Sequence, residues 1–146
     1  MKYEIIPFKP EHWDMIEFRE FEHKTMGQFL EGIRIKVGAV GPAYTGLVDG
    51  KVAGFAGVML MWPGVGEGWI LGSDLFSEHK LWFARNVKKY MIKIMNTHDL
   101  HRVQTTVAHG HTALIRLVEF LGMKFEGRLR NYGPGGEDYL MYGRIN

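Results

Sequence analysis

The sequence predicts an α/β fold with a central mixed, mostly antiparallel sheet and helices on both of its faces. Three observations carry this prediction. An Asp49-Gly50 pair separates two β-rich runs, two amphipathic helical patterns occupy the second half, and each of those patterns lies between two predicted strands. Hairpins join antiparallel strands, whereas strand–helix–strand units join parallel ones, so the sheet is expected to be mixed.

The first half of the chain is predicted to contain a strand, a helix, an irregular segment and a hairpin. These occupy residues 3–7, 10–26, 27–43 and 44–62, respectively. The helix follows from Pro10 at its start and from the absence of glycine or proline inside it. The irregular segment follows from its repeated glycines. Asp-Gly favours a two-residue turn, which places the hairpin turn at Asp49-Gly50.

The second half alternates strands with two long helices and ends in a strand pair. The strands are predicted at 67–76, ending near Ser77, and at 101–109, 124–130 and 137–143. The first helix has one apolar face formed by Phe83, Val87, Tyr90, Met91 and Ile94. The second has Leu114, Leu117, Val118 and Leu121 on one face. Gly122 is expected to end this second helix as its C-terminal cap.

Composition limits the functional classes. A chain of 146 residues with 46% apolar content suits one domain, residues 1–146. Without cysteine it has no disulfide and no thiolate nucleophile. A net charge of +2 makes nucleic acid an unlikely partner, and no apolar run approaches the roughly 18 residues of a membrane span. We expect a cytoplasmic protein, and oligomer formation stays open.

Residues 100–145 carry a family pattern. Its matching positions are Leu114, Leu117, Leu121, Gly122, Met123, Glu126, Gly127, Leu129 and Arg130, with Asp138, Tyr139 and Tyr142 beyond. This pattern resembles the C-terminal half of the GCN5-related N-acetyltransferase (GNAT) superfamily, in the branch that acetylates protein N-termini. The predicted order of elements extends the resemblance to the whole chain. Divergent chains of this kind also resemble some encoded by tailed bacteriophages.

The resemblance implies acetyl-CoA as co-substrate. In this superfamily the fourth and fifth strands splay apart around the pantetheine arm, and the pyrophosphate lies on N–H groups at the following helix start. The family's Q/R-x-x-G-x-G/A pattern falls on residues 79–84. The implied cofactor-binding residues are Leu75, Phe76, His79, Lys80, Trp82, Phe83, Ala84 and Arg85. Trp82 replaces a glycine, so either the amides still point outward or the indole blocks the site.

The resemblance also implies a carboxylate base and further polar groups. Asp74, near the end of the fourth strand, is the candidate base, and Glu67 is a poorer one because it lies farther from the splay. Asp74 also suits a cap before the helix. His111 replaces the family's Asn and would bind the pantetheine arm or transfer a proton, or it is an exposed histidine before a helix. In the family a tyrosine protonates the leaving thiolate, and the corresponding position here holds Val118.

The histidines also permit a metal interpretation, which we do not favour. His98, His101, His109 and His111 lack a carboxylate at a telling spacing, so we expect surface histidines and no metal. Tyr132 would shape an acceptor pocket or hold its loop down. The predicted function is therefore acetyl transfer to a small-molecule or protein amine. The alternative is a catalytically degenerate GNAT-fold protein with a binding or structural role, such as a bacteriophage virion or host-directed protein.

Overall fold

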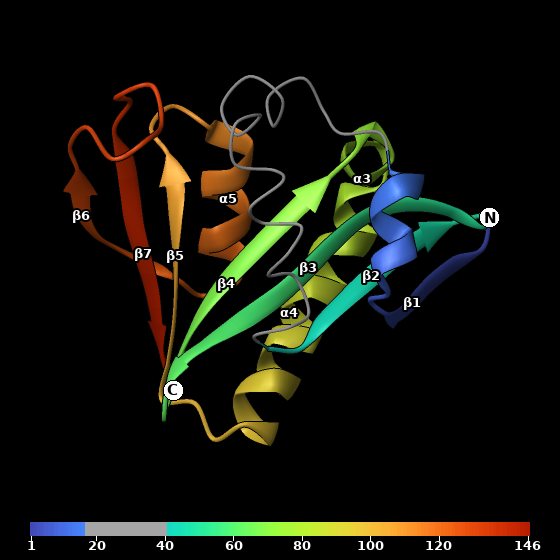
Figure 1. The fold of residues 1–146 in the computed structure, drawn as a ribbon, viewed down its shortest axis with the longest axis horizontal. Coiled ribbons are helices and arrows are strands. Elements are labelled where there is room, and N and C mark those ends of the chain that lie inside the picture. Colours follow the sequence, from blue (N-terminus) through green and yellow to red (C-terminus); the bar gives the residue numbers. More distant parts are fainter. Residues whose placement is uncertain (17–40) are drawn as a thin grey trace. The chain divides into compact units, whose positions relative to one another are not determined.

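A computed structural model describes residues 1–16 and 41–146 (Figure 1). Its strands are β1 Tyr3–Pro7, β2 Ala43–Val48, β3 Lys51–Trp62, β4 Val65–Gly72, β5 Arg102–Ala108, β6 Lys124–Leu129 and β7 Tyr139–Ile145. Its helices are a 3-10 helix at Pro10–Met15, α3 Asp74–Glu78, α4 Lys80–Thr97 and α5 Thr112–Phe120. No helix within these ranges is long and apolar enough to cross a membrane.

The strands form one hydrogen-bonded sheet in the order β1-β2-β3-β4-β5-β7-β6. The pairs β1–β2, β2–β3, β5–β7 and β6–β7 are antiparallel, whereas β4 and β5 are parallel. The predicted mixed, mostly antiparallel sheet with helices is therefore confirmed. The parallel pair requires a crossover, and α3 and α4 supply it between β4 and β5.

The chain divides into two compact units. Unit 1 comprises the described residues of Met1–Met59 together with Trp69–Phe83. Unit 2 comprises Leu60–Gly68 and Ala84–Asn146. Strands β3 and β4 and helix α4 each continue from one unit into the other.

Unit 1 is built around the predicted hairpin and an aromatic core. Asp49 and Gly50 both have positive φ, 49° and 79°, which a two-residue hairpin turn of the primed type requires. This confirms the hairpin prediction. The core contains Trp13 and Phe55, whose rings stack with centroids 5.8 Å apart. Phe55 is only 1% exposed, so the face of the hairpin that carries Phe55 is buried in this core.

Unit 2 is built on β5, β7, β6 and α5 (Figure 1). Val103 and Val107 of β5 are fully buried, which fits the period-two alternation of that strand. Helix α5 ends before Gly122, whose φ is +83° and which therefore suits the left-handed position after a helix. Arg144 Nη1 donates to the Leu121 carbonyl at 2.8 Å, so one terminal acceptor of the helix is satisfied. The predicted stop at Gly122 is confirmed.

Two element boundaries differ from the predictions. Strand β4 ends at Gly72, not near Ser77, because Ser73 N and Ser73 Oγ both donate to the Ala53 carbonyl and the chain then turns into α3. Ser73 occupies the N-cap position of α3, a position that serine favours. The predicted helix 10–26 begins as a 3-10 helix, and its part from residue 17, like residues 27–40, lies outside the described residues.

Candidate functional site

The ladder between β4 and β5 is short. It pairs Val65–Glu67 with Arg102–Gln104, three residues of an eight-residue strand. At the next step the Thr105 hydroxyl, Oγ1, donates to the Gly68 carbonyl at 2.8 Å. On its other side β5 pairs with β7 along its whole length, from Arg102 to Ala108. The residues at the end of this parallel ladder are therefore the natural place to look for polar groups with a function.

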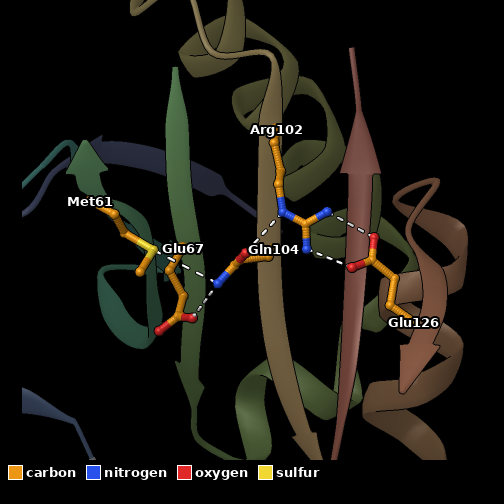
Figure 2. Close-up of polar contacts among 5 residues, drawn as sticks. All are labelled: Met61, Glu67, Arg102, Gln104 and Glu126. Carbon is orange, nitrogen blue, oxygen red and sulfur yellow. Dashed lines mark hydrogen bonds and ion pairs between the residues drawn. The ribbon is translucent and has the colours of Figure 1, made fainter. Parts of the chain in front are cut away.

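A polar network lies at the end of this ladder (Figure 2). Gln104 Nε2 donates to Glu67 Oε1 at 3.3 Å and contacts Met61 Sδ at 3.8 Å. Gln104 Oε1 accepts from Arg102 Nε at 2.9 Å. Arginine has no acceptor atom, so the amide oxygen must face Arg102 and the amide NH2 must face Glu67. The orientation of the Gln104 amide is therefore set by its neighbour two residues earlier.

Arg102 is itself held by a two-bond ion pair. Its Nη1 and Nη2 donate to the two carboxylate oxygens of Glu126 at 2.8 and 2.6 Å. The hydrogen bond to Glu126 raises the pKa of Arg102, and the same bond lowers the pKa of Glu126. Glu126 lies at a register irregularity of β6, between Phe125 and Gly127. The pair therefore reaches from β5 to β6 across the intervening strand β7.

Gly143 of β7 makes this reach possible. A Cβ atom at residue 143 would meet Glu126 Oε2, and it would lie 2.9 Å from Arg102 Nη1. Both contacts are too close for a carbon atom, so any side chain at this position would displace the ion pair. Gly143 is directly opposite Gln104 in the β5–β7 ladder, which places the whole network on one face of the sheet of unit 2.

The charges within the network do not cancel. Arg102 and Glu126 neutralise each other, whereas the partner of Glu67 among residues 1–16 and 41–146 is the neutral amide of Gln104. The three ionised groups therefore sum to one negative charge, located on Glu67. Its side chain is half-buried, and a negative charge in this position can attract a cationic amine.

Asp74, the predicted base, is the first residue of α3. Its side chain is exposed, and an acidic residue in the first turn interacts favourably with the helix dipole. Ser73, not Asp74, occupies the N-cap position, so the structure does not give Asp74 the capping role that the sequence also allowed. A catalytic role for Asp74 stays a prediction. Asp74 belongs to unit 1, whereas Glu67 belongs to unit 2.

The indole of Trp82 packs on the N-terminal strand. It stacks on Tyr3 with ring centroids 4.5 Å apart and planes 15° apart. Tyr3 also hydrogen-bonds through its hydroxyl to His79 Nδ1 at 2.9 Å. Phe83 meets Trp82 edge-on at 5.1 Å, and its ring occupies the space that the missing side chain of Gly46 leaves on β2. Trp82 is thus part of an aromatic cluster with Tyr3, His79 and Phe83.

The other predicted cofactor-binding residues lie along α3 and the start of α4. Phe76 is buried and stacks on Phe83 at 5.0 Å. His79 N donates to the Leu75 carbonyl and Phe83 N to the His79 carbonyl, both at 3.2 Å, so α3 continues into α4 with only His79 between them. Residues 80–84 are therefore helical rather than an extended loop. Leu75 and Ala84 are half-buried, and Lys80 and Arg85 are exposed.

His111 caps helix α5. Its Nδ1 accepts from Leu114 N at 3.3 Å, and its backbone N donates to the Ala108 carbonyl. Because Nδ1 is an acceptor here, the neutral ring carries its proton on Nε2. Val118, at the family's tyrosine position, is 3% exposed and apolar. The imidazole therefore does locally what an Asn cap does, and any catalytic role of His111 stays a prediction.

Tyr132 lies in the loop between β6 and β7. Asp138 anchors this loop, since it accepts from Asn131 N at 3.0 Å and from Arg128 Nε at 2.6 Å, and these bonds lower the pKa of Asp138. The Tyr132 ring is 55% exposed and lies 5.3 Å from Tyr139. Burial, followed by the charge of Glu137, raises the pKa of Tyr139.

No metal site was expected, and the residues that the structure describes contain no group of three or more His, Asp or Glu side chains able to hold one. Sequence reasoning missed the roles of Arg102, Gln104 and Gly143. The alternation of "RVQTTVA" does indicate that Arg102 and Gln104 share one face of the strand, while the buried valines lie on the other face. Their partners Glu67 and Glu126 required the strand register.

The sequence has no significant match to a protein-family model or to a curated protein. Solved structures do match, and the fold is that of the GNAT-family acetyltransferases. A GNAT-family acetyltransferase from Bacillus anthracis has a TM-score of 0.77 and 17% identity, covering 99% of this chain and 95% of that one.

Two further similar structures differ in what their names say they modify. The ribosomal-protein-S5-alanine acetyltransferase from Vibrio fischeri has a TM-score of 0.74 and 15% identity, covering 99% of this chain and 93% of its own. A variant of the spermidine N-acetyltransferase SpeG from Vibrio cholerae has a TM-score of 0.67 and 16% identity, covering 98% and 93%. At these identities the likeness establishes the fold.

Proposed function

We propose that this protein transfers an acetyl group from acetyl-CoA to an amine. The observation that carries the proposal is the early end of the β4–β5 ladder, after Glu67 and Gln104, in a chain with the GNAT fold over nearly its whole length. In the family that the sequence resembles, the pantetheine arm of acetyl-CoA lies where these strands cease to pair. The edge of β5 beyond Gln104 is the proposed position here.

The reaction needs a group that takes a proton from the amine. The amine nitrogen bonds to the thioester carbon, the carbon–sulfur bond breaks, the amine proton passes to a base, and the leaving sulfur takes up a proton. Asp74 and Glu67 are the two proposed bases, and the hydrogen-bonded setting of Glu67 supports the latter. Val118 has no proton to give, so we propose that the sulfur is protonated from solvent. We propose that His111 binds the pantetheine arm or transfers a proton beside it.

The proposed acceptor is a small-molecule or protein amine. Names among the similar structures include both kinds, a ribosomal-protein alanine and spermidine. The residue pattern at 114–130 supports the branch that acetylates protein N-termini. The single negative charge on Glu67 suits either acceptor, because both are cationic before the proton is lost.

The first experiment separates binding from chemistry. Acetyl-CoA at about 1 mM should raise the melting temperature, because a ligand that binds only the folded state stabilises it by mass action. ADP, which lacks the pantetheine arm, is the matched control. Release of CoA thiol is then measured with spermidine and with a peptide that begins with alanine. An unchanged melting temperature and no thiol release with either acceptor would refute the proposal.

The same assay identifies the base. Glu67→Gln and Asp74→Asn each remove a carboxylate while keeping the side-chain shape. Loss of a general base costs about 100-fold or more in turnover. We expect this loss in Glu67→Gln and a change below about threefold in Asp74→Asn. The reverse result would return the role to Asp74.

A second candidate function has its own support. Val118 is apolar and buried where the family has a tyrosine, and Trp82 occupies a glycine position. These departures support a catalytically degenerate GNAT-fold protein with a binding or structural role, for example in a bacteriophage virion or directed at its host. A folded protein that gains no stability from acetyl-CoA would favour this alternative.

A further inference from the structure

The amide of Gln104 can be turned in two ways. In one, the NH2 group faces Glu67; in the other, the oxygen faces Glu67 and repels its carboxylate. Arg102 Nε, at 2.9 Å from Gln104 Oε1, selects the first, because a guanidinium only donates. The carboxylate of Glu67 thereby accepts a hydrogen bond from Gln104 Nε2 at 3.3 Å.

The structural requirements of the Arg102–Glu126 pair exceed its value for stability. The side chains are 22% and 35% exposed, and exposed ion pairs contribute roughly 0–1 kcal/mol. The pair nevertheless needs a glycine at 143, where a Cβ atom would lie 2.9 Å from Arg102 Nη1. A glycine inside a strand weakens it through backbone entropy and lost packing. The pair is thus a poor stabiliser with a demanding geometry.

We propose that Arg102 is a positioning residue for acyl transfer, which orients the Gln104 amide so that Glu67 faces the acceptor amine. Glu126, across Gly143, holds the guanidinium in place for this role. The inference rests on the proposed acetyltransferase function and deepens it. Arg102 touches neither acceptor nor cofactor in this proposal; it acts through Gln104, and Glu67 takes the proton.

The decisive test exchanges the two charges. Arg102→Met removes both the ion pair and the bond to Gln104. The double variant Arg102→Glu with Glu126→Arg keeps an ion pair across Gly143, but residue 102 then only accepts. Gln104 must turn its NH2 group toward residue 102 and its oxygen toward Glu67. Arg144→Met is the control, because it removes an arginine of the same unit whose guanidinium donates to the Leu121 carbonyl and not to the network, as far as the described part of the chain shows.

The expected results differ between positioning and stability. Arg102→Met should lower kcat about 10- to 100-fold, since small misplacements of a reacting group have effects of that order, with the KM for acetyl-CoA nearly unchanged. The exchanged variant should regain the wild-type melting temperature but keep the low kcat. Arg144→Met should have a lower melting temperature than the wild type and an unchanged kcat. Recovery of kcat in the exchanged variant would overturn the proposal, as would equal kcat losses in Arg102→Met and Arg144→Met.

The wild-type protein separates the two levels of inference. If it acetylates an amine and Glu67→Gln is inactive while Arg102→Met is fully active, the positioning role fails and the proposed function stands. If the wild type transfers no acetyl group to spermidine or to the alanine peptide, both fail together. Side-chain amide resonances of Gln104 in nitrogen-15 spectra give a readout independent of activity. They should move in Arg102→Met and stay in place in Arg144→Met.

Discussion

Units 1 and 2 each contain residues that depart from the family pattern or from simple strand alternation, but for different physical reasons. In unit 1, Trp82 stacks on Tyr3 and belongs to an aromatic cluster at the start of α4. In unit 2, Arg102 and Gln104 form hydrogen bonds on a partly exposed sheet face. Aromatic packing explains Trp82, whereas the hydrogen bonds of Arg102 and Gln104 bury little surface. A polar arrangement that packing does not explain is therefore the better guide to function.

The same contrast applies to titratable groups. In unit 1, His12 is 8% exposed, and its Nδ1 contacts Thr45 Oγ1 at 2.7 Å and accepts from Lys9 N at 3.1 Å. Burial lowers the pKa of His12. In unit 2, Glu126 has its pKa lowered by a hydrogen bond from Arg102 on the surface. We therefore expect substitutions in the buried core of unit 1 to cost more stability than substitutions in the surface network of unit 2.

The largest expected effect is the loss of the unit 1 core. Phe55→Ala removes a ring that is 1% exposed and that stacks on Trp13, and such truncations cost about 3–5 kcal/mol of unfolding free energy. Urea denaturation measures the loss. Leu81→Ala, at a side chain that is 69% exposed, is the control and should change stability by less than about 0.5 kcal/mol. Similar losses in both variants would show that the proposed core is wrong.

The aromatic cluster gives the next effect. Trp82→Gly and Leu81→Gly place glycine at neighbouring positions in the first turn of α4, so both carry a comparable helix penalty. Trp82→Gly also loses the stack on Tyr3, which adds at least about 0.5–1.5 kcal/mol. Chemical denaturation of the two variants gives the difference. If Trp82→Gly were no less stable than Leu81→Gly, the indole would have no packing role.

Acid should weaken the protein through His12. Its pKa is lowered in the folded state, so the unfolded chain binds more protons in the range between the folded pKa and the ordinary value near 6.5. This contribution to stability is complete above the ordinary value and is lost as the pH falls toward the folded pKa. Urea midpoints measured from pH 7.5 to pH 5 should fall, and less so in His12→Gln. Parallel curves for the two proteins would exclude His12 as the cause.

The smallest expected effect on stability is that of the surface ion pair. Glu126→Gln removes one charge from a pair that is exposed to solvent, so it should cost under about 1 kcal/mol at pH 7. The pKa of Glu126 is lowered, so this contribution is present above its ordinary pKa and disappears as the pH falls through the folded value. Denaturation at pH 7 and pH 3 measures both. A loss above about 2 kcal/mol at pH 7 would show that the network is structural.

Much of the fold was predictable from the sequence. The strand at residues 3–7, the turn at Asp49-Gly50 and the end of α5 before Gly122 were predicted where the structure has them. Each depends on a local signal: side-chain alternation, turn chemistry or a cap. Helix α3 was missed because Asp74–Glu78 is only five residues long, too short for helical periodicity to show. Its one local signal was Ser73 at the N-cap position.

The candidate site was predictable only in part. Asp74, His111 and residues 79–84 came from a family pattern, and their catalytic and binding roles stay predictions. The pattern could not reveal that Trp82 stacks on Tyr3, since the two residues are far apart in the chain. Glu67 ranks below Asp74 in the sequence because it lies farther from the expected splay of the strands. Its hydrogen bond to Gln104 is invisible in the sequence.

The sequence by itself determined the strands and the two long helices of the second half, and their order, because periodicity, turn residues and caps act within a few positions of the chain. The tertiary structure alone decided which polar side chains meet. Glu67, Gln104 and Glu126 lie on three different strands, β4, β5 and β6. The register of those strands, and the missing side chain of Gly143 between them, bring the groups within hydrogen-bonding distance. Register depends on contacts between distant segments, and no local pattern specifies it.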